Sequence, residues 1–167
     1  MARRSGTERA ARPVRPRALG PAWPLLLAAH AVLLERVETK LKAASLPELA
    51  WYDVMWALER APEGRLRMHE LADALVVSRS NLTRLADRLE AAGLLRRERG
   101  GEDRRGAFAV LTPAGNALRQ RMWPVYADAI EELFDRHLSA AENAMLADML
   151  KRVLRAASTD GGSATSS

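Results

Sequence analysis

The sequence contains no cysteine among its 167 residues. Disulfide bonds, thiolate metal sites and cysteine nucleophiles are therefore excluded. No apolar run reaches the roughly 18 residues that a membrane-spanning helix requires, so no span is predicted. The histidines are also few: His30, His69 and His137 sit in unrelated contexts, which makes a metal site improbable.

The motifs of common catalytic sites are missing as well. The chain has no glycine-rich phosphate loop, no nucleophile elbow and no paired-carboxylate signature. We therefore expect a protein that is not an enzyme and needs no cofactor or metal. Turnover in an esterase or nuclease screen would revive the enzyme hypothesis.

The net charge of +5 is placed unevenly along the chain. Residues 1–20 hold six arginines against one acid, Glu8, while the remaining chain is neutral overall. This segment has little apolar content and no periodicity, so we predict a disordered basic arm. It could solubilise the protein or bind phosphates non-specifically. Residues 158–167, STDGGSATSS, are predicted to form a flexible tail.

The apolar run from Leu25 to Leu34 follows the basic arm, as a signal peptide would. However, a helical pattern continues through the cleavage-like Ala29-His30-Ala31. Apolar residues and one histidine recur at spacings of four and three: Trp23, Leu27, His30, Leu34, Val37 and Leu41. One amphipathic helix of about five turns is therefore predicted, and we expect a cytoplasmic protein.

Residues 68–111 predict a helix, a tight turn, a second helix and two short strands. Leu71, Ala72 and Leu75 lie on one face of the first helix. Ser78 is a favourable N-cap for the second helix, and Gly93 supplies the backbone freedom that ends it. The second helix has its own apolar face: Leu82, Leu85, Ala86 and Leu89.

A charged loop, residues 100–106, joins the two predicted strands. Glycines at both ends permit a hairpin, and Arg104 and Arg105 make it basic. Residues 64–67 are predicted to form a further short strand that can pair with this hairpin. Helix, turn, helix and basic hairpin together predict a winged helix-turn-helix. From residue 78 to residue 105, eight arginines oppose five acids.

The outer face of the second helix carries small hydroxyls, an amide and arginines. Such side chains suit base edges and phosphates, although a merely solvated face is the alternative. The predicted DNA-contacting residues on this helix and its N-cap are Ser78, Ser80, Asn81, Thr83, Arg84 and Arg88.

The remaining helices flank this unit. One begins near Pro47, carries Tyr52, Met55 and Leu58 to pack under the helix-turn-helix, and stops before Pro62. A long helix runs from Thr112 to about Arg136 and should kink at Pro124. Ser139 and Glu142 form a capping box for the last helix. The first and last helices have apolar stripes that a second copy of the chain would bury.

The string LADALVVSRSNLTRLADRLEAAGLLRRERGGEDRRGAFAVLTPAG resembles the DNA-binding core of the MarR family of bacterial transcriptional regulators. The similarity is traceable from about Trp23 to Ala156. It implies an obligate dimer whose two winged domains grip a pseudo-palindromic operator in double-stranded DNA. It also points to Arg105 as the wing-tip residue and to Asp103 as its support. Four residues of the wing are thus predicted to serve DNA binding: Arg99, Asp103, Arg104 and Arg105.

Regulators that resemble this chain often bind small aromatic or anionic molecules between the dimerisation helices and the winged domain. By position, six residues could line such a cleft: His30, Trp51, Tyr52, Met55, Trp56 and Met68. Each could equally be an ordinary core residue. A constitutive regulator without a ligand, and a winged helix that binds protein, are the alternatives.

The predicted fold is mainly α with a small β-wing. Residues 46–111 form the winged helix-turn-helix DNA-binding region. Residues 21–45 and 112–157 form a helical dimerisation region drawn from both chain ends. The predicted function is a homodimeric transcriptional regulator, a repressor that a small effector releases from DNA.

Overall fold

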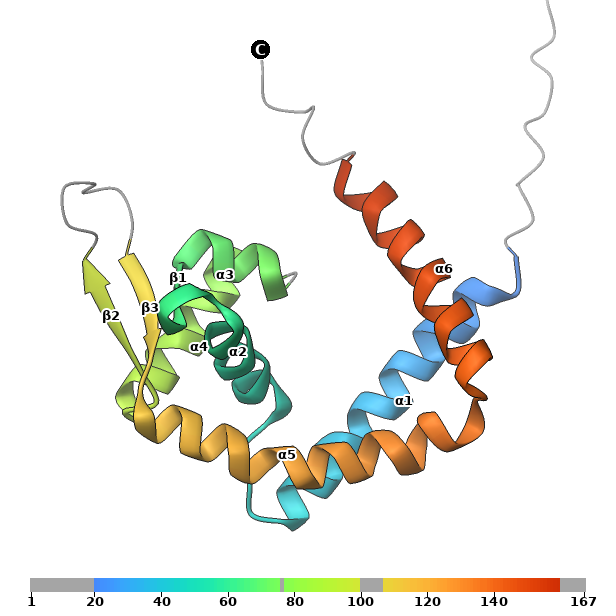
Figure 1. Cartoon of the computed structure of the whole chain (residues 1–167), viewed down its shortest axis with the longest axis horizontal. Helices are drawn as coiled ribbons and strands as arrows, with labels where there is room; N and C mark the ends of the chain where they lie inside the picture. The colour runs from blue at the N-terminus through green and yellow to red at the C-terminus, as the bar shows by residue number, and fades with distance from the viewer. Residues whose placement is uncertain (1–19, 76, 100–106, 160–167) are drawn as a thin grey trace, which may run out of the picture.

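The structure, a computed structural model, describes residues 20–75, 77–99 and 107–159. Within these ranges the chain is mainly helical with one small antiparallel sheet, as the sequence predicts (Figure 1). The helices are α1 (Ala22–Ala43), α2 (Leu49–Arg60), α3 (Met68–Leu75), α4 (Arg79–Ala91), α5 (Pro113–Leu133) and α6 (Ala140–Thr159). Two short 3-10 helices are η1 (Pro62–Gly64) and η2 (Asp135–His137), and the strands are β1 (Arg65–Arg67), β2 (Leu95–Arg99) and β3 (Ala107–Leu111).

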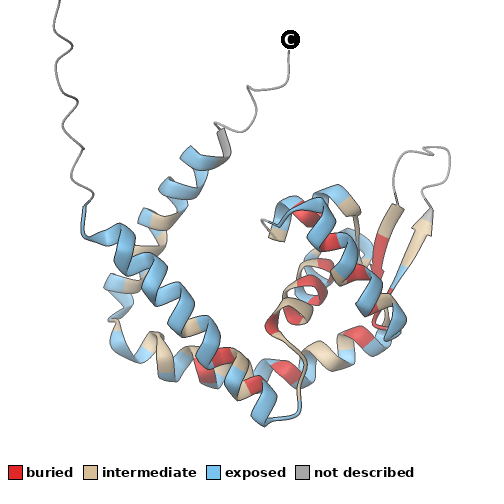
Figure 2. Cartoon of the chain, turned by 180° about the vertical axis from the view of Figure 1, so that it is seen from behind, coloured by how far each residue is buried: buried red, intermediate tan, exposed pale blue. Residues whose placement is uncertain are grey.

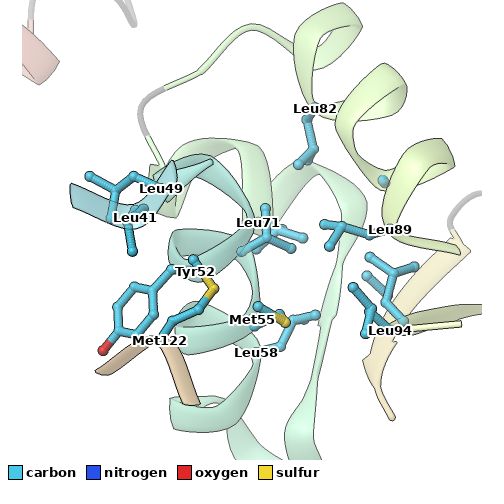
Figure 3. Close-up of a cluster of buried hydrophobic side chains, with 14 of the residues drawn as sticks. Leu41, Leu49, Tyr52, Met55, Leu58, Leu71, Leu82, Leu89, Leu94 and Met122 are labelled. Atoms are coloured by element: carbon cyan, nitrogen blue, oxygen red, sulfur yellow. The ribbon is translucent and has the colours of Figure 1, made fainter. Parts of the chain in front are cut away.

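Helix α2 lies at the centre of the core. Its Val54, Met55 and Leu58 are fully buried, and Met55 and Leu58 lie in one cluster with Leu71 of α3 and Leu89 of α4 (Figure 3). The predicted packing of Tyr52, Met55 and Leu58 under the helix-turn-helix is confirmed, because all three are buried. Burial of each such side chain contributes roughly 1.5–3 kcal/mol, so this cluster holds the winged unit together.

The helix-turn-helix also has the caps that the sequence predicts. The Asn81 N–H donates to Ser78 Oγ at 3.3 Å, so Ser78 is the N-cap of α4. Gly93 follows the C-terminal end of α4 with a φ of 71°, a conformation that favours glycine. Helix α4 turns Leu82, Ala86 and Leu89 into the core, whereas Leu85 is only half-buried.

The sheet has the order β1-β3-β2, and both pairs of strands are antiparallel. Arg65 pairs with Val110, and Leu95 pairs with Leu111. The predicted pairing of a short strand at residues 64–67 with the wing is therefore confirmed, although the strand begins at Arg65. Residues 100–106, which connect β2 to β3, lie outside the described ranges.

Hydrogen bonds join the start of α5 to the residues that follow α4. The Thr112 hydroxyl accepts the Gly115 N–H at 3.0 Å and donates to the Gly93 carbonyl at 2.8 Å. The Leu94 carbonyl accepts the Thr112 N–H at 3.2 Å, which brings the two backbones together. Helix α5 thus begins where the winged unit ends and extends away from the sheet (Figure 1).

Helix α5 ends earlier than expected. It is continuous through Pro124 but stops at Leu133 rather than near Arg136. Phe134 leaves the helical region with a φ of −134°, and the chain then turns through η2. The capping box of α6 is confirmed: Ser139 N–H donates to Glu142 Oε2 at 2.8 Å, and Glu142 N–H donates to Ser139 Oγ at 3.3 Å.

Most residues of α1 and α6 are exposed (Figure 2), and several of the exposed residues are large and apolar. Trp23 is 54% exposed, and within α1 only Val37 and Leu41 are buried. None of residues 140–157 of α6 is buried, and its Met145 is 58% exposed. No helix in the described ranges combines the length and apolar character needed to cross a membrane.

Gly115 allows the close approach of α5 to the end of α4. A Cβ atom at this position would collide with the Leu94 carbonyl oxygen and lie 2.9 Å from Leu111 Cδ1. We expect Gly115→Ala to lower the free energy of unfolding by roughly 1–3 kcal/mol, because backbone must move to admit the methyl group. Urea denaturation measures this loss. Gly20→Ala is the matched control, since nothing lies within 4 Å of its added Cβ; equal stability of the two variants would contradict the prediction.

Candidate nucleic-acid interface

The outer face of α4 begins with a cluster of small polar side chains. The hydroxyl oxygens of Ser78 and Ser80 lie 3.2 Å apart. The Asn81 side-chain oxygen accepts a hydrogen bond from Arg84 Nη2 at 2.7 Å. Ser80, Asn81 and Arg84 are exposed, because the apolar side of α4 faces α2 and α3. This arrangement presents an amide and a guanidinium together, already oriented by each other.

Thr83 belongs to the same face but is less available as a donor. Its hydroxyl donates to the Arg79 carbonyl at 2.9 Å, one helical turn back. Its own carbonyl accepts a hydrogen bond from Arg97 Nη2 at 3.2 Å. Thr83 therefore lies beside the predicted contact residues, but its hydroxyl and its carbonyl oxygen both form hydrogen bonds within the chain.

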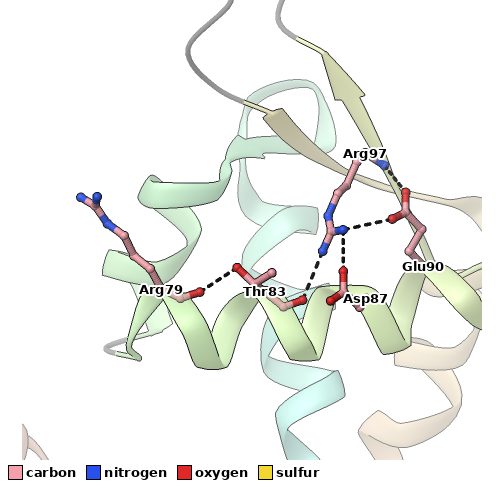
Figure 4. Close-up of polar contacts among 5 residues, drawn as sticks. All are labelled: Arg79, Thr83, Asp87, Glu90 and Arg97. Atoms are coloured by element: carbon pink, nitrogen blue, oxygen red, sulfur yellow. Dashed lines mark hydrogen bonds and ion pairs between the residues drawn. The ribbon is translucent and has the colours of Figure 1, made fainter.

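Arg79 is a further candidate that the sequence reasoning did not select. It is the first residue of α4, it is exposed, and its guanidinium projects away from the helix (Figure 4). In the part of the chain that the structure describes, no carboxylate lies within ion-pair distance of Arg79. Its place directly after the N-cap was the available signal, because groove contacts concentrate at the start of a recognition helix.

Arg88 is engaged by another element. Its Nη1 lies 2.6 Å from Glu48 Oε1, and its guanidinium carbon lies 5.5 Å from the centroid of the Trp51 ring. The Trp51 indole N–H donates to the same Glu48 oxygen at 3.1 Å. Arg88 thus joins α4 to the start of α2, and Trp51 takes part in that contact.

Arg97 of β2 connects the wing to α4, a role that the sequence reasoning missed. Its Nη1 lies 2.6 Å from Asp87 Oδ1 and 3.4 Å from Glu90 Oε2 (Figure 4). Its backbone N–H donates to Glu90 Oε1 at 2.8 Å. The positive charge of Arg97 therefore compensates two acids on α4. No sequence signal pairs these residues, because the contact crosses from a strand to a helix.

The predicted wing tip lies outside the described residues. This applies to Asp103, Arg104 and Arg105, and to the side chain of Arg99. Arg99 is placed only by its backbone, as the last residue of β2 opposite Ala107. Their roles in DNA binding stay predictions.

The six predicted ligand-binding residues have different surroundings in the described part of the chain. Tyr52 and Met55 are core residues, and Met68 packs half-buried against the core. Trp51 lies against Arg88, and the exposed Trp56 lies 4.8 Å from the Arg60 guanidinium. Only His30 lines a described pocket.

That pocket is a cavity of about 640 Å³ between α1, α2 and α5. Its walls are mostly apolar, and its polar side chains are His30, Glu38, Asp53 and Tyr126. Pockets of roughly 300–1,000 Å³ with few polar groups are typical ligand sites. Among the residues that the structure describes, no three histidine, aspartate or glutamate side chains gather as metal ligands.

Asp53 has an unusual environment in this pocket. Burial, and then the neighbouring Glu38 carboxylate, raise its pKa from an ordinary 3.8 to about 6. Burial raises the pKa of the Tyr126 hydroxyl, and the Asp53 carboxylate raises it further. The sequence reasoning did not select Asp53, since one aspartate on a helix gives no signal until its neighbours are known.

Comparison with known proteins identifies the family. A model of the MarR family matches residues 47–106. The transcriptional repressor MprA of Escherichia coli K12 is 30% identical over 122 residues, which are 73% of this chain and 68% of MprA. The chain belongs to the MarR family. The relatives found are transcriptional regulators and not enzymes, in agreement with the absence of catalytic motifs.

Solved structures agree with this assignment. AbsC, a MarR family transcriptional regulator from Streptomyces coelicolor, superposes with a TM-score of 0.79 at 29% identity, covering 86% of this chain and 99% of AbsC. Sco3205, a MarR family regulator from the same organism solved in complex with DNA, gives a TM-score of 0.76 at 29% identity, covering 81% of this chain and 88% of Sco3205. The winged fold of this MarR-family chain is therefore shared over most of its length.

The contacts of Arg97 predict that it positions the wing of this MarR-family protein. Arg97→Ala should speed amide hydrogen exchange in β2 and lower the free energy of unfolding by no more than about 1 kcal/mol, because the ion pairs are partly exposed. Arg96→Ala is the control, since Arg96 pairs with Glu98 on its own strand. Equal exchange in β2 for the two variants would show that Arg97 does not brace the wing.

Proposed function

We propose that the protein is a sequence-specific DNA-binding regulator, a repressor that binds a pseudo-palindromic operator as a homodimer. The observation that carries this proposal is the exposed polar start of α4, with Ser80, Asn81 and Arg84 on a helix whose Leu82, Ala86 and Leu89 are buried on the opposite face. A rigid helix with this surface suits insertion into the major groove.

The side chains on α4 match the chemistry of base edges. Arginine can pair with the two acceptors of guanine, and asparagine with the donor and acceptor of adenine. Arg79 adds a cation at the same end of the helix, where phosphates or bases are within reach. The wing residues Arg99, Arg104 and Arg105 would contact DNA beside this helix, with Asp103 supporting one of the arginines.

Relatives of the protein support both parts of this proposal, the binding of DNA and the repression of transcription. Sco3205 is solved in complex with DNA, and the C80S variant of MarR from E. coli is solved with operator DNA at a TM-score of 0.71 and 27% identity. MprA is described as a transcriptional repressor. We extend DNA binding and repression from these proteins to this one.

The uncovered apolar surface of α1 and α6 supports the proposed homodimer. Trp23, Leu27, Met145 and Met149 are between 43% and 58% exposed, although all four lie on amphipathic helices. A second copy that covers these residues would explain their position. In this arrangement residues 21–45 and 112–157 form the dimerisation region, and residues 46–111 form the DNA-binding region.

Release by a small effector completes the proposed function. The pocket between α1, α2 and α5 lies where the dimerisation helices meet α2 of the winged unit. A molecule bound there would contact both regions and could bias their arrangement. This pocket replaces the more dispersed set of aromatic residues as the proposed effector site, and retains only His30 from that set.

Substitution of Arg84 tests whether this side chain contacts the bases of DNA or only its phosphates. Arg84→Ala should weaken binding by roughly 1–3 kcal/mol and reduce discrimination among duplexes that differ at single base pairs. Titration of labelled duplexes measures both quantities. Arg36→Ala, on the exposed surface of α1, is the control. A loss that is equal for all duplexes would mean that Arg84 contacts only the phosphates.

Sedimentation tests the homodimer. The double variant Met145→Glu/Met149→Glu should no longer sediment as a dimer, because it places two charges on the apolar face of α6. Trp56→Gln, which alters an exposed apolar side chain of α2, should remain dimeric. If the unaltered protein sediments as a single 18.4 kDa chain at micromolar concentration, the proposed dimer is wrong.

A further inference from the structure

The charges in the α1–α2–α5 pocket restrict what can bind there. Two carboxylates, Glu38 and Asp53, line the cavity, and its lining contains no lysine or arginine. Across the described residues, no cationic group lies within ion-pair distance of Asp53. Glu38 uses one oxygen, Oε1, to accept the Leu49 N–H at 2.9 Å. The pocket is therefore an acidic site whose lining holds no permanently charged cation.

The rest of the cavity is apolar and aromatic. Leu34, Ile130, Leu133 and Phe134 form much of its wall, and Tyr126, whose hydroxyl is close enough to Asp53 for the carboxylate to raise its pKa, also lines it. Tyr126 is held edge-on against Tyr52, with their ring centroids 5.1 Å apart. A carboxylate near an aromatic ring suits an organic cation, because both attract positive charge.

We propose that this pocket binds a small cationic molecule with an apolar body, such as a protonated amine on an aromatic or hydrocarbon group. Its charge lies against Asp53 and Glu38, and its body lies among the leucines and Phe134. Anionic aromatic molecules are disfavoured, because a third negative charge would enter a site that already lacks compensation. This assigns a ligand class opposite in charge to the anions expected from the family resemblance.

Glu38 also connects the pocket, through the start of α2, to α4. Glu38 accepts the N–H of Leu49, the first residue of α2. Glu48, which directly precedes Leu49, is paired with Arg88 of α4. A bound cation that attracts the Glu38 carboxylate would therefore disturb its hydrogen bond with the first residue of α2. The effect of the ligand on DNA rests on the proposed function, whereas its binding to the pocket does not.

Matched probes of opposite charge test the binding. Calorimetry of the full chain without DNA compares 1-naphthylmethylamine, which is protonated near neutral pH, with 1-naphthoate. At about pH 7.5 we expect the amine to bind roughly tenfold or more tighter than the carboxylate. Asp53→Asn should weaken amine binding by roughly tenfold and leave naphthoate binding no weaker. Asp128→Asn, an exposed change on α5 outside the pocket, should have no effect.

Glu38→Gln separates charge from structure. Glutamine keeps an oxygen that can accept the Leu49 N–H, so α2 should still begin correctly while the pocket loses one charge. We expect weaker amine binding with unchanged circular dichroism. The proposal is wrong if naphthoate binds as tightly as the amine. It is also wrong if neither Asp53→Asn nor Glu38→Gln changes the affinity for the amine.

The pH dependence gives an independent readout. The titratable groups around Asp53 are His30 and Glu38 on α1, Tyr126 on α5 and Tyr52 on α2 itself. Because the pKa of Asp53 is about 6, its negative charge is lost as the pH falls through that value. Amine affinity should fall from about pH 7.5 to about pH 5, and fall less in Asp53→Asn. An equal fall in both proteins would assign the effect to other groups and contradict the role of Asp53.

A DNA titration then separates the two proposals. Saturating amine should weaken duplex binding by the unaltered protein roughly tenfold, but not by Asp53→Asn. Charge-dependent amine binding with unchanged DNA affinity would keep the site and reject its role as an effector site. Amine binding by a protein that binds no duplex would reject the proposed function and keep the ligand site.

Discussion

The burial of one face of α4 determines what its other face can do. Leu82, Ala86 and Leu89 are almost fully buried against α2 and α3, so the helix has a single rotational setting. Turning it would expose these side chains, at roughly 25 cal/mol for each Å² returned to water. The polar residues Ser80, Asn81 and Arg84 are consequently held on the outside. The candidate DNA-binding surface thus depends on apolar packing behind it.

Polar contacts refine this arrangement. Arg97 attaches β2 to Asp87 and Glu90, and Arg88 attaches α4 to Glu48 and Trp51. Partly exposed ion pairs contribute little stability, so their main effect is to fix the wing and the start of α2 relative to α4. Four arginines of the winged unit therefore differ in availability: Arg79 and Arg84 face outward, whereas Arg88 and Arg97 are paired with acids.

Much of this fold is predictable from local sequence patterns. The caps at Ser78 and Ser139, the turn at Gly93 and the apolar face of α4 all follow from neighbouring residues. The roles of Arg88 and Arg97 do not, because their partners lie on other elements. The same is true of Asp53, whose raised pKa depends on Glu38 and on burial beneath α1 and α5. Within the candidate site, sequence reasoning identified the exposed face but not the contacts that position it.

In the proposed complex, two copies of this chain present two α4 helices to one DNA duplex. Selection of bound duplexes from a random-sequence pool tests it most directly, because symmetry of the protein must be reflected in the site. We predict enrichment of an inverted repeat whose half-sites lie roughly 34 Å, or about one helical turn, apart. Recovery of a single unrepeated motif, or of no motif at all, would contradict the claim.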